Sequence, residues 1–408
     1  MKKIIALVLC VVMVLAVAGC ATKDAAKSSA AVATTQAAAA TTQAAAATTQ
    51  AAAATTAATT SAATTTQATT TSAAASDTGT IPLSQLGKQD GKEFTITYLS
   101  PSTASEYWQY NEIGMKNAIA DLQSQCGIKV NFSTTGAAEE SQSDAYVKAF
   151  ESTIASKPDA IITATLAAEA TVPKTQEAKD AGIYVNFVGM GLEGGDSNQY
   201  GDLYGVHYYC DNTVIGETAA QAMLDQMKKK GIEPKGIVGI HMSVIVDTLE
   251  ARMDGFKAYM KKNAPDLQCL DTLYNQNQLE NAQSNVETQI STYGDKLVGL
   301  YGANNISGDG IALGIAGANL SDKVVGIGVD SDSTEIDALK AGNLDVIVAQ
   351  TPYEQGYNAM VNAVEYLVTG KNYATEKHIN CPSQAVTKDN MTEDKFAALL
   401  DPTLLEKK

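Results

Sequence analysis

Phe94-Thr95-Ile96-Thr97-Tyr98-Leu99 is a short run of apolar and β-branched residues, a composition that favours a buried strand. The polar segment Ser100–Ser105 and the aromatic pair Tyr107-Trp108 follow it. Beyond them, apolar side chains recur at helical spacing, at Met115, Ile119, Leu122 and Cys126. A strand that leads through a polar loop into a helix is the repeating unit of a parallel α/β sheet.

The same alternation of short apolar runs and helix-length segments continues along the chain. Beyond the first strand, we expect strands at 129–133, 160–165, 184–188, 205–209, 236–241, 270–274, 298–301, 324–329 and 346–349. We expect further helices at 143–156, 168–181, 212–230, 249–263, 279–293, 309–319 and 353–369, with Ser333, ahead of Glu335, as the cap of another.

This pattern predicts an α/β fold in which parallel sheets are covered by helices on both faces. Because strand–helix–strand crossovers are right-handed, the loops that follow the strands lie on one rim of each sheet. Open α/β sheets bind their ligands at that rim. Residues directly after the strands are therefore the first candidates for a site.

The first twenty residues have the pattern of an export signal. Two lysines precede the apolar stretch Ile4–Ala18, which is too short to span a bilayer comfortably. The segment ends in Leu15-Ala16-Val17-Ala18-Gly19-Cys20, which resembles a bacterial lipoprotein signal. The resemblance implies that residues 1–19 are removed, that Cys20 is acylated, and that the remainder works outside the cytoplasm. An ordinary secretory signal with a chance cysteine is the alternative.

Residues 25 to about 78 contain almost only Ala, Thr, Gln and Ser, and Ala-Thr-Thr-Gln-Ala-Ala-Ala recurs within them. Such a segment cannot bury enough apolar surface to offset chain entropy. We therefore expect residues 20–79 to be a lipidated cysteine followed by a disordered linker, whose root-mean-square span is about 40 Å. The chain beyond about Lys92 has a globular composition and is long enough for two α/β lobes.

Charge and cysteine usage exclude several classes of partner. The formal net charge of −16 argues against nucleic acid or an anionic membrane face. Cys126, Cys210, Cys269 and Cys381 show no CxxC or other metal-ligand spacing, and the three histidines do not cluster. We expect no metal, no cofactor and buried free thiols, with a Cys210–Cys381 disulfide as the alternative.

Two motifs suggest cofactor or metal chemistry but lack the context for it. Gly189-Met190-Gly191-Leu192-Glu193-Gly194 matches GxGxxG, yet a polar loop rather than a helix follows, which favours a flexible rim loop over a dinucleotide site. Asp330-Ser331-Asp332-Ser333 lacks the glycine and the terminal acid of a calcium loop. No GxSxG, HExxH or paired nucleophile and base is present, so we expect no enzyme activity.

Tyr107-Trp108 is the strongest candidate for a ligand contact. Trp108 is the only tryptophan of the chain, and the pair follows the first strand at the expected rim. Aromatic side chains there stack on the face of a flat ring. The alternative is that the pair fills the core of its lobe.

Several stretches together resemble the type I periplasmic binding proteins, and the ribose- and galactose-type sugar binders most of all. They are 94–99 with Tyr107-Trp108, Asp211-Asn212 before Gly216, Arg252-Met253-Asp254-Gly255-Phe256, Ala303-Asn304-Asn305, Val325-Gly326-Ile327-Gly328-Val329-Asp330, and Ala349-Gln350-Thr351-Pro352. The resemblance runs in one order over residues 92 to 390. It implies two similar lobes joined by three crossings, near 210–211, 350–351 and 380–381. The first lobe is then 92–210 plus 351–380, the second 211–350 plus 381–390, and 391–408 is a tail that either packs as a short helix or frays.

The resemblance also implies the site. Ser105, Tyr107 and Trp108 match the polar-aromatic-aromatic loop of the family, and Asn304, Asp330 and Gln350 match positions that bind sugar hydroxyls. Where sugar binders have an Asp-Arg pair, this chain has Gly189-Met190, and Glu250 replaces a second arginine.

These replacements change the expected chemistry, because arginine forks usually hold vicinal oxygens. Met190 makes one wall less polar, and Glu250 with Asp247 makes the site more acidic. Glu250 either meets a donor on the ligand or pairs with a local lysine such as Lys257. Arg252 is expected in a scaffold ion pair or as a contact to the ligand.

The function implied is a monomeric, lipid-anchored solute-binding protein on the outer face of the cytoplasmic membrane. It captures a small polar ligand, first of all a sugar or polyol, and delivers it to an ABC permease. Two alternatives stay open: a ligand sensor for a signalling receptor, and a binder of an amine-bearing or less hydroxylated ligand.

Overall fold

The computed structural model describes residues 78–192 and 199–407. The predicted export signal, Cys20 and the Ala/Thr/Gln linker up to residue 77 lie outside the described residues. No helix within the described ranges combines the length and apolar character needed to cross a membrane.

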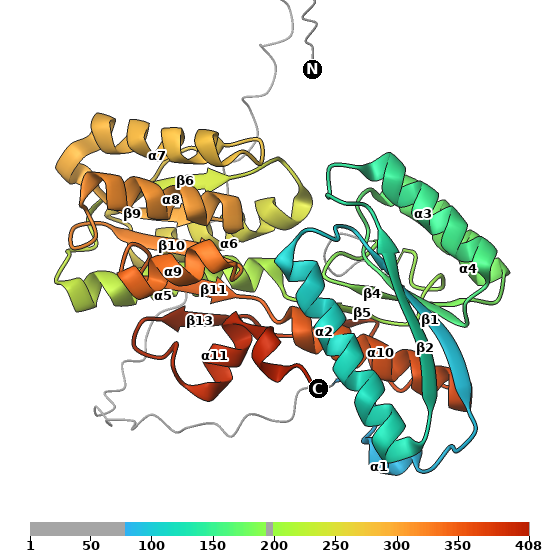
Figure 1. Ribbon diagram of the computed structural model, residues 1–408. Helices are drawn as coiled ribbons and strands as arrows, with labels where there is room; N and C mark the ends of the chain where they lie inside the picture. Colours follow the sequence, from blue (N-terminus) through green and yellow to red (C-terminus); the bar gives the residue numbers. More distant parts are fainter. Residues whose placement is uncertain (1–77, 193–198, 408) are drawn as a thin grey trace, which may run out of the picture. The chain divides into compact units, whose positions relative to one another are not determined.

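The first lobe is built on a six-stranded parallel sheet with the order β12-β5-β4-β3-β1-β2 (Figure 1). Its strands are β1 (Glu93–Ser100), β2 (Lys129–Gly136), β3 (Ala160–Thr163), β4 (Tyr184–Val188), β5 (His207–Tyr209) and β12 (His378–Asn380). Its helical segments are α1 (Leu83–Leu86), α2 (Glu106–Asp121), η1 (Leu122–Cys126), α3 (Ser143–Ser156), α4 (Ala168–Asp180) and α10 (Pro352–Thr369). Below, the first lobe means these elements and their connections.

The second lobe is built on a seven-stranded sheet with the order β13-β11-β10-β9-β6-β7, and β8 also pairs with β6. Its strands are β6 (Gly236–Met242), β7 (Leu267–Cys269), β8 (Leu273–Tyr274), β9 (Leu297–Gly302), β10 (Val325–Val329), β11 (Val346–Ala349) and β13 (Gln384–Thr387). Only β13 is antiparallel to its neighbour. The helical segments are α5 (Asn212–Lys230), α6 (Asp247–Asn263), α7 (Leu279–Tyr293), η2 (Gly294–Lys296), α8 (Asn305–Ala318), α9 (Ser333–Ala341), α11 (Asp394–Leu400) and η3 (Pro402–Leu405).

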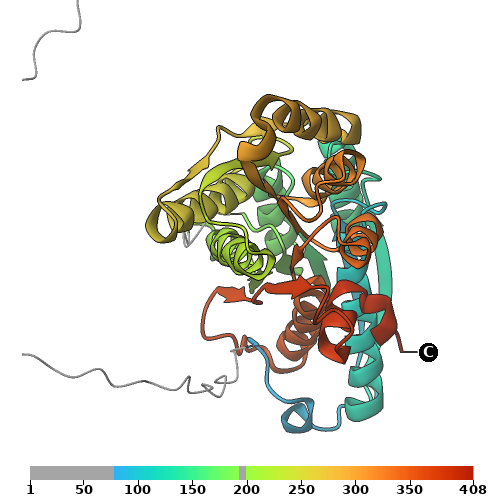
Figure 2. The ribbon, with the colours of Figure 1, turned by 90° about the vertical axis from the view of Figure 1, so that its left-hand side faces the viewer.

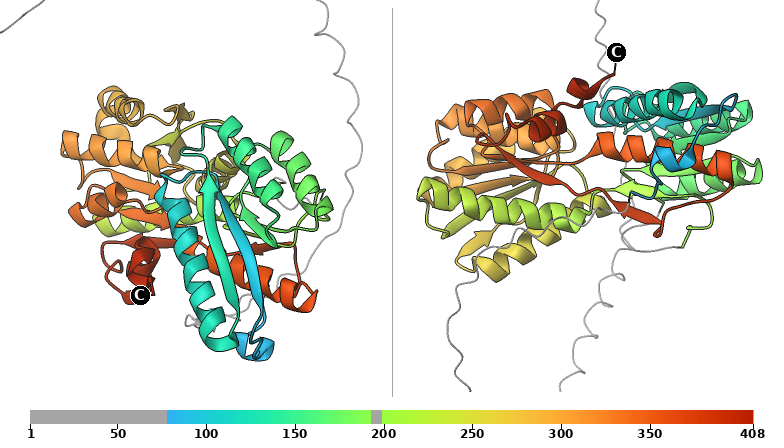
Figure 3. Two further views of the ribbon diagram at one scale, coloured as in Figure 1. Left: turned by 45° about the vertical axis from the view of Figure 1, so that its right-hand side comes forward. Right: turned by 90° about the horizontal axis from the view of Figure 1, so that it is seen from below.

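Both sheets are buried on their two faces, which is why their strands are almost continuously apolar. In β1, Ile96 and Tyr98 belong to one core cluster and Leu99 to another. In β11, Val346 and Ile347 likewise belong to different clusters. Helices lie on both sides of each sheet in the views of Figure 3.

Three segments connect the lobes, and they lie side by side. The Cys210 thiol donates to the Cys381 carbonyl oxygen at 2.9 Å, and the Thr351 hydroxyl donates to the same oxygen at 3.0 Å. The Asp211 N–H donates to Asn380 Oδ1 at 3.0 Å. Because each connection bonds to another, their backbones are held as one unit. The right-hand view of Figure 3 shows the red C-terminal segment running from one sheet to the other.

Most expected elements are observed, and five match at both ends: β4, β11, α3, α5 and α7. The strand expected at 270–274 is wrong in its bounds, since β7 covers 267–269 and β8 only 273–274. The helix cap assigned to Ser333 is also wrong. Asp332 caps α9, because its Oδ1 accepts the Glu335 N–H at 2.9 Å.

The thiols of Cys126, Cys210, Cys269 and Cys381 are all free. Three of them are buried, whereas Cys269 is half-buried. The described residues thus hold no disulfide between Cys210 and Cys381.

The C-terminal tail packs as a short helix. Phe396 and Leu400 of α11 belong to a core cluster of the second lobe. The chain then continues to α2 of the first lobe, where Asn117 Nδ2 donates to the Leu405 carbonyl oxygen at 2.7 Å. Lys407 Nζ lies 2.5 Å from Asp121 Oδ1. Figure 2 shows the C-terminal end beside α2, so the tail contacts both lobes.

Candidate functional site

All nine residues predicted for the ligand site follow the carboxyl end of a strand. Ser105, Tyr107 and Trp108 follow β1, Met190 follows β4, Asp247 and Glu250 follow β6, Asn304 follows β9, Asp330 follows β10, and Gln350 follows β11. Parallel strands bring these ends to one rim of each sheet. The contacts below show which of the side chains interact.

Tyr107 is held by a polar contact and an aromatic one. Its hydroxyl donates to Gln355 Oε1 of α10 at 3.1 Å. Its ring meets that of Trp108 edge-on, with 4.8 Å between the centroids. Burial raises the pKa of Tyr107 well above its usual value, with smaller contributions from Cys210 and Asp330. Tyr107 of the first lobe therefore lies within electrostatic reach of Asp330 of the second.

Trp108 combines a core position with a polar contact at the rim. Its side chain is only 2% exposed and belongs to the core cluster of the first lobe. Its Nε1–H donates to Glu140 Oε1 at 2.6 Å. The indole ring thus packs in the core, while its N–H fixes a carboxylate on the loop after β2.

Glu140 is a functional candidate that the sequence did not reveal. Glu140 is exposed to solvent. The surrounding protein nevertheless raises the pKa of its carboxyl group by desolvation, and the charge of Asp330 raises it further. The hydrogen bond from Trp108 opposes both effects. Glu140 therefore belongs with Tyr107 and Trp108 on the side of the site that the first lobe provides.

The Gly189-Met190 segment lies against the same aromatic pair. Gly189 has a φ of 68°, and a Cβ there would lie 3.0 Å from both Trp108 Cη2 and Tyr107 Oη. Only glycine combines that backbone angle with so close an approach. Met190 is half-buried and packs against the core cluster of the first lobe. This segment therefore supplies a close-fitting, weakly polar surface beside Tyr107.

On the second lobe, the candidates Asp330 and Gln350 contact each other directly. Gln350 Nε2 donates to Asp330 Oδ1, and Gln350 is 8% exposed. Asp330 has a φ of 95°, a conformation that is strained for a residue other than glycine. Nearby on the rim, Asn304 Oδ1 accepts the Ser307 hydroxyl at 2.7 Å. Strain of this kind persists where the surroundings fix the residue, and functional sites are where it concentrates.

Arg252 supports the rim through neutral oxygen atoms. Its Nε donates to Asn212 Oδ1 at 2.9 Å, and its Nη1 donates to the Ala303 carbonyl oxygen at 2.8 Å. No carboxylate of the described residues forms an ion pair with Arg252. The prediction of a scaffold ion pair is therefore wrong, because the partners of Arg252 are neutral. Because Ala303 precedes Asn304, Arg252 fixes the backbone that carries this candidate.

Ser105, Asp247 and Glu250 are not joined to these contacts. Ser105 is half-buried, and its N–H donates to Ser102 Oγ at 3.2 Å. Asp247 and Glu250 are exposed on the first turn of α6. Lys257, considered as a partner for Glu250, donates to Thr272 Oγ1 instead. Contacts join Trp108 to Tyr107 and to the unpredicted Glu140, and Gln350 to Asp330, while Asn304 lies on the same rim as Asp330 and Gln350. We call these six residues the rim site.

A second acidic group lies beside the rim site. Burial raises the pKa of Asp309 to about 7, and Asp332 and Glu106 add to this effect. Glu106 of the first lobe accepts a 3.5 Å contact from the Ser333 hydroxyl of the second. No three His, Cys, Asp or Glu residues in ranges 78–192 and 199–407 are placed to hold a metal ion.

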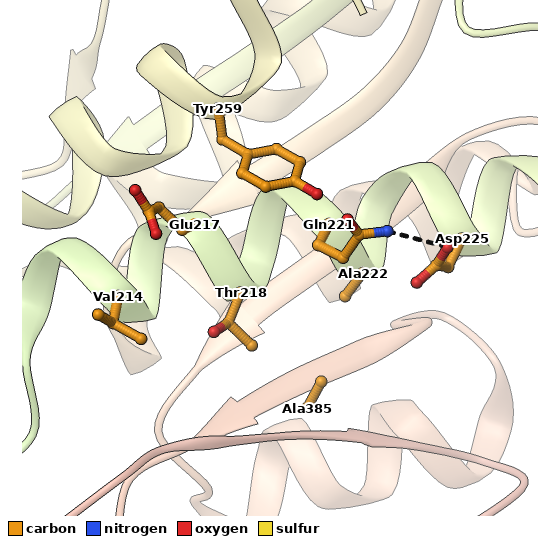
Figure 4. A pocket seen from close by; sticks show the side chains of 8 residues that line it. All are labelled: Val214, Glu217, Thr218, Gln221, Ala222, Asp225, Tyr259 and Ala385. Carbon is orange, nitrogen blue, oxygen red and sulfur yellow. Dashed lines mark hydrogen bonds between the residues drawn. The ribbon is translucent and has the colours of Figure 1, made fainter. Parts of the chain in front are cut away.

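A groove elsewhere on the second lobe is separate from the rim site (Figure 4). It lies between α5, α6 and β13, and Tyr259, Glu217 and Ala385 are among the residues that line it. Along α5, at the edge of this groove, Gln221 Nε2 donates to Asp225 Oδ1 at 3.1 Å. None of the nine predicted ligand contacts lines this groove.

Comparison with known proteins places the chain in a family. No curated protein matches it. A solute-binding protein of an ABC transporter from Agrobacterium vitis, solved with α-D-tagatopyranose, is 28% identical, with a TM-score of 0.65 over 75% of this chain and 99% of that one. A carbohydrate transporter solute-binding protein from Agrobacterium radiobacter, solved with D-arabinose, is 28% identical, with a TM-score of 0.64 over 76% of this chain and 100% of that one. The model of the periplasmic binding protein domain matches residues 96–372, and the chain therefore belongs to this family.

Proposed function

We propose that this protein captures a sugar or polyol outside the cytoplasm and delivers it to an ABC permease. Its family consists of binding proteins, and the protein is accordingly not an enzyme. The observation that carries the proposal is the rim site, where Tyr107 and Glu140 of the first lobe lie within electrostatic reach of Asp330 of the second, to which Gln350 is hydrogen-bonded. The solved relatives with bound tagatose and arabinose support a sugar as the class of ligand.

The rim site suits a small hydroxylated ring. Amide and carboxylate groups accept or donate hydrogen bonds in fixed directions, which selects hydroxyl positions. Tyr107 offers a flat apolar face beside them. A ligand that touches both lobes shifts the equilibrium between open and closed forms by its differential affinity for the closed form. No chemical step is needed for capture or release.

The two lobes are the domains of this proposal. Residues 92–210 with 351–380, together with α1, form one, and 211–350 with 381–390, together with α11 and η3, form the other. The bonded segments near 210, 351 and 381 are the hinge. The proposed anchor is Cys20, acylated after removal of residues 1–19. The linker then lets a monomer work at the outer face of the cytoplasmic membrane.

A thermal-shift screen of the purified protein tests the proposal. Pentoses, hexoses, polyols, amino sugars, nucleosides and small amines are each added at a large excess. At a concentration of 100 times the dissociation constant, a ligand adds about 2.7 kcal/mol to the free energy of unfolding, which raises the melting temperature by several degrees. A shift with a sugar or polyol supports the proposal. Shifts with nucleosides alone would contradict it.

A sensing function for the same site is tested separately. A transport protein delivers its ligand to a permease, so deletion of the permease abolishes uptake of the ligand. A sensor leaves uptake intact and changes a signalling output instead.

A further inference from the structure

The rim site has carboxylate groups on both lobes, and several of the donors around them are engaged within the protein. The Tyr107 hydroxyl donates to Gln355, the Trp108 indole donates to Glu140, and the Gln350 amide donates to Asp330. Arg252 uses its Nε and Nη1 on Asn212 and Ala303. The Asn304 amide and the remaining N–H groups of Arg252 form no hydrogen bond among the described residues, so a ligand finds donors as well as acceptors here.

The carboxylates of Glu140 and Asp330 each use only one of their two oxygens within the described part of the protein. Trp108 occupies Glu140 Oε1, and Gln350 occupies Asp330 Oδ1. Within residues 78–192 and 199–407, no hydrogen bond occupies the second oxygen of either carboxylate, and Glu140 is exposed while Asp330 is half-buried. Each lobe thus presents one carboxylate oxygen that is ready to accept a hydrogen bond.

Neither carboxylate forms an ion pair with a side chain of the described residues. Desolvation by the surrounding protein and the charge of Asp330 both raise the pKa of Glu140, and the Trp108 hydrogen bond opposes them. The two positions at which the resemblance implies arginine are Met190 and Glu250 in this chain. Like charges that face each other are destabilising unless a donor or cation lies between them.

A fully buried carboxyl group without hydrogen-bond partners in the described part of the chain lies within electrostatic reach of Asp330. Glu335 of α9 is 0% exposed, and neither of its oxygens has a hydrogen-bond partner among the described residues. Its carboxyl group lies against Gly308 and Gly328, and Asp332, Asp309 and Asp330 all lie within its electrostatic reach. Burial raises the pKa of Glu335 well above its usual value, and the three aspartates add to this effect.

We propose that the rim site binds a ligand with a protonated amine, held between Glu140 of the first lobe and Asp330 of the second. The class of ligand is an amino sugar, and this assignment rests on the proposed capture of sugars. An ammonium group has three donors, so it can serve both free carboxylate oxygens at once. Both contacts are charge-assisted, and the ammonium removes the repulsion between the two acids.

Isothermal titration calorimetry of the purified protein at pH 7 tests this assignment. The probes are D-galactosamine and D-glucosamine, their parent hexoses, and their N-acetyl forms, which keep the ring but lose the charge. We expect the better amino sugar to bind about tenfold more tightly, or better, than its parent hexose and its N-acetyl form.

Glu140→Gln is the decisive variant, because the amide keeps the shape of the side chain and an oxygen for Trp108. It should remove the preference for the amino sugar, so that the amino sugar binds no more tightly than its parent hexose does in the same variant. Glu139→Gln, at the neighbouring exposed position, is the matched control and should keep the preference. If Glu140→Gln unfolds at a lower temperature, Asp330→Asn provides the same test from the other lobe.

The outcomes separate this inference from the proposed function. Tighter binding of neutral hexoses overturns the assignment of an amine and leaves sugar capture intact. An unchanged preference in both variants overturns the roles of Glu140 and Asp330. If neither charged nor neutral sugars bind, the amine assignment and the proposed sugar capture fail together.

Discussion

The two sides of the rim site are built in different ways. On the first lobe, Trp108 is part of the core, and Tyr107 and Glu140 are fixed by contacts to buried groups. On the second lobe, Asp330 is held in a strained backbone conformation by a hydrogen bond from Gln350. On the first lobe, a residue of the binding site therefore also stabilises the core. On the second lobe, the site consists of polar side chains at the carboxyl ends of β10 and β11. Substitutions on the two sides should therefore affect different properties.

Trp108→Ala should have the largest effect, and on stability. Removing a buried tryptophan from a core costs about 3–5 kcal/mol of the free energy of unfolding. Tyr107→Phe is the matched control, since it removes only the hydroxyl that bonds Gln355 and should cost about 1 kcal/mol. Urea unfolding at neutral pH measures both values. If both variants lost the same free energy of unfolding, Trp108 would not contribute to the core more than the Tyr107 hydroxyl does at the rim.

Buried carboxyl groups should make stability fall as the pH rises. Glu365 on α10 is fully buried, its Oε1 accepts the Ile81 N–H at 3.1 Å, and burial raises its pKa to about 8. Between its ordinary pKa and about 8, the folded protein binds the proton more strongly than the unfolded chain does. Stability is therefore lost through this window, at up to about 1.4 kcal/mol per pH unit.

Glu365→Gln measures this effect directly. The variant should be more stable than the natural protein at pH 8 and equal to it at pH 4. The comparison is made at each pH, because His207 and His241 act in the opposite direction. Burial lowers their pKa values to about 3 and about 4, so they reduce stability as the pH falls below 6.5. A difference between variant and natural protein that does not change with pH would contradict the raised pKa of Glu365.

Asp330 should show the reverse pattern to Trp108. Asp330→Ala and Asp330→Gly both remove the carboxylate, so both should weaken ligand binding about tenfold or more. Glycine also relieves the positive φ of 95° at this position, so Asp330→Gly should be about 1 kcal/mol more stable than Asp330→Ala. Calorimetric binding and thermal unfolding of the two variants check this. An Asp330→Ala variant as stable as Asp330→Gly would show that the strain is not significant.

Loss of the ion pair between Lys407 and Asp121 of α2 should have the smallest effect on stability. The Lys407 side chain is 46% exposed, and exposed ion pairs contribute about 0–1 kcal/mol. Lys407→Ala should therefore lower the free energy of unfolding by less than about 1 kcal/mol, and less so at high salt. Lys340→Ala, which removes the exposed pair with Asp337 within the second lobe alone, is the control. A much larger loss for Lys407→Ala would indicate that the tail holds the lobes together.

The sequence predicted the strands and helices well where the apolar pattern was long, as for α5 and α7. It did not separate the two interpretations of Trp108, because a buried ring and an indole N–H at the rim look the same in a pattern. Glu140 carried no signal, since its position depends on one hydrogen bond across 32 positions of sequence. Asp332 and Ser333 are both good capping residues, so only the backbone geometry decides between them.

A crystal structure with the sugar that gives the largest thermal shift is the most direct test of the rim site. We expect the ligand to lie between the lobes, against Tyr107 on one side and bonded to Asp330 and Gln350 on the other. A ligand bound in the groove between α5, α6 and β13, or one that touches a single lobe, would contradict it.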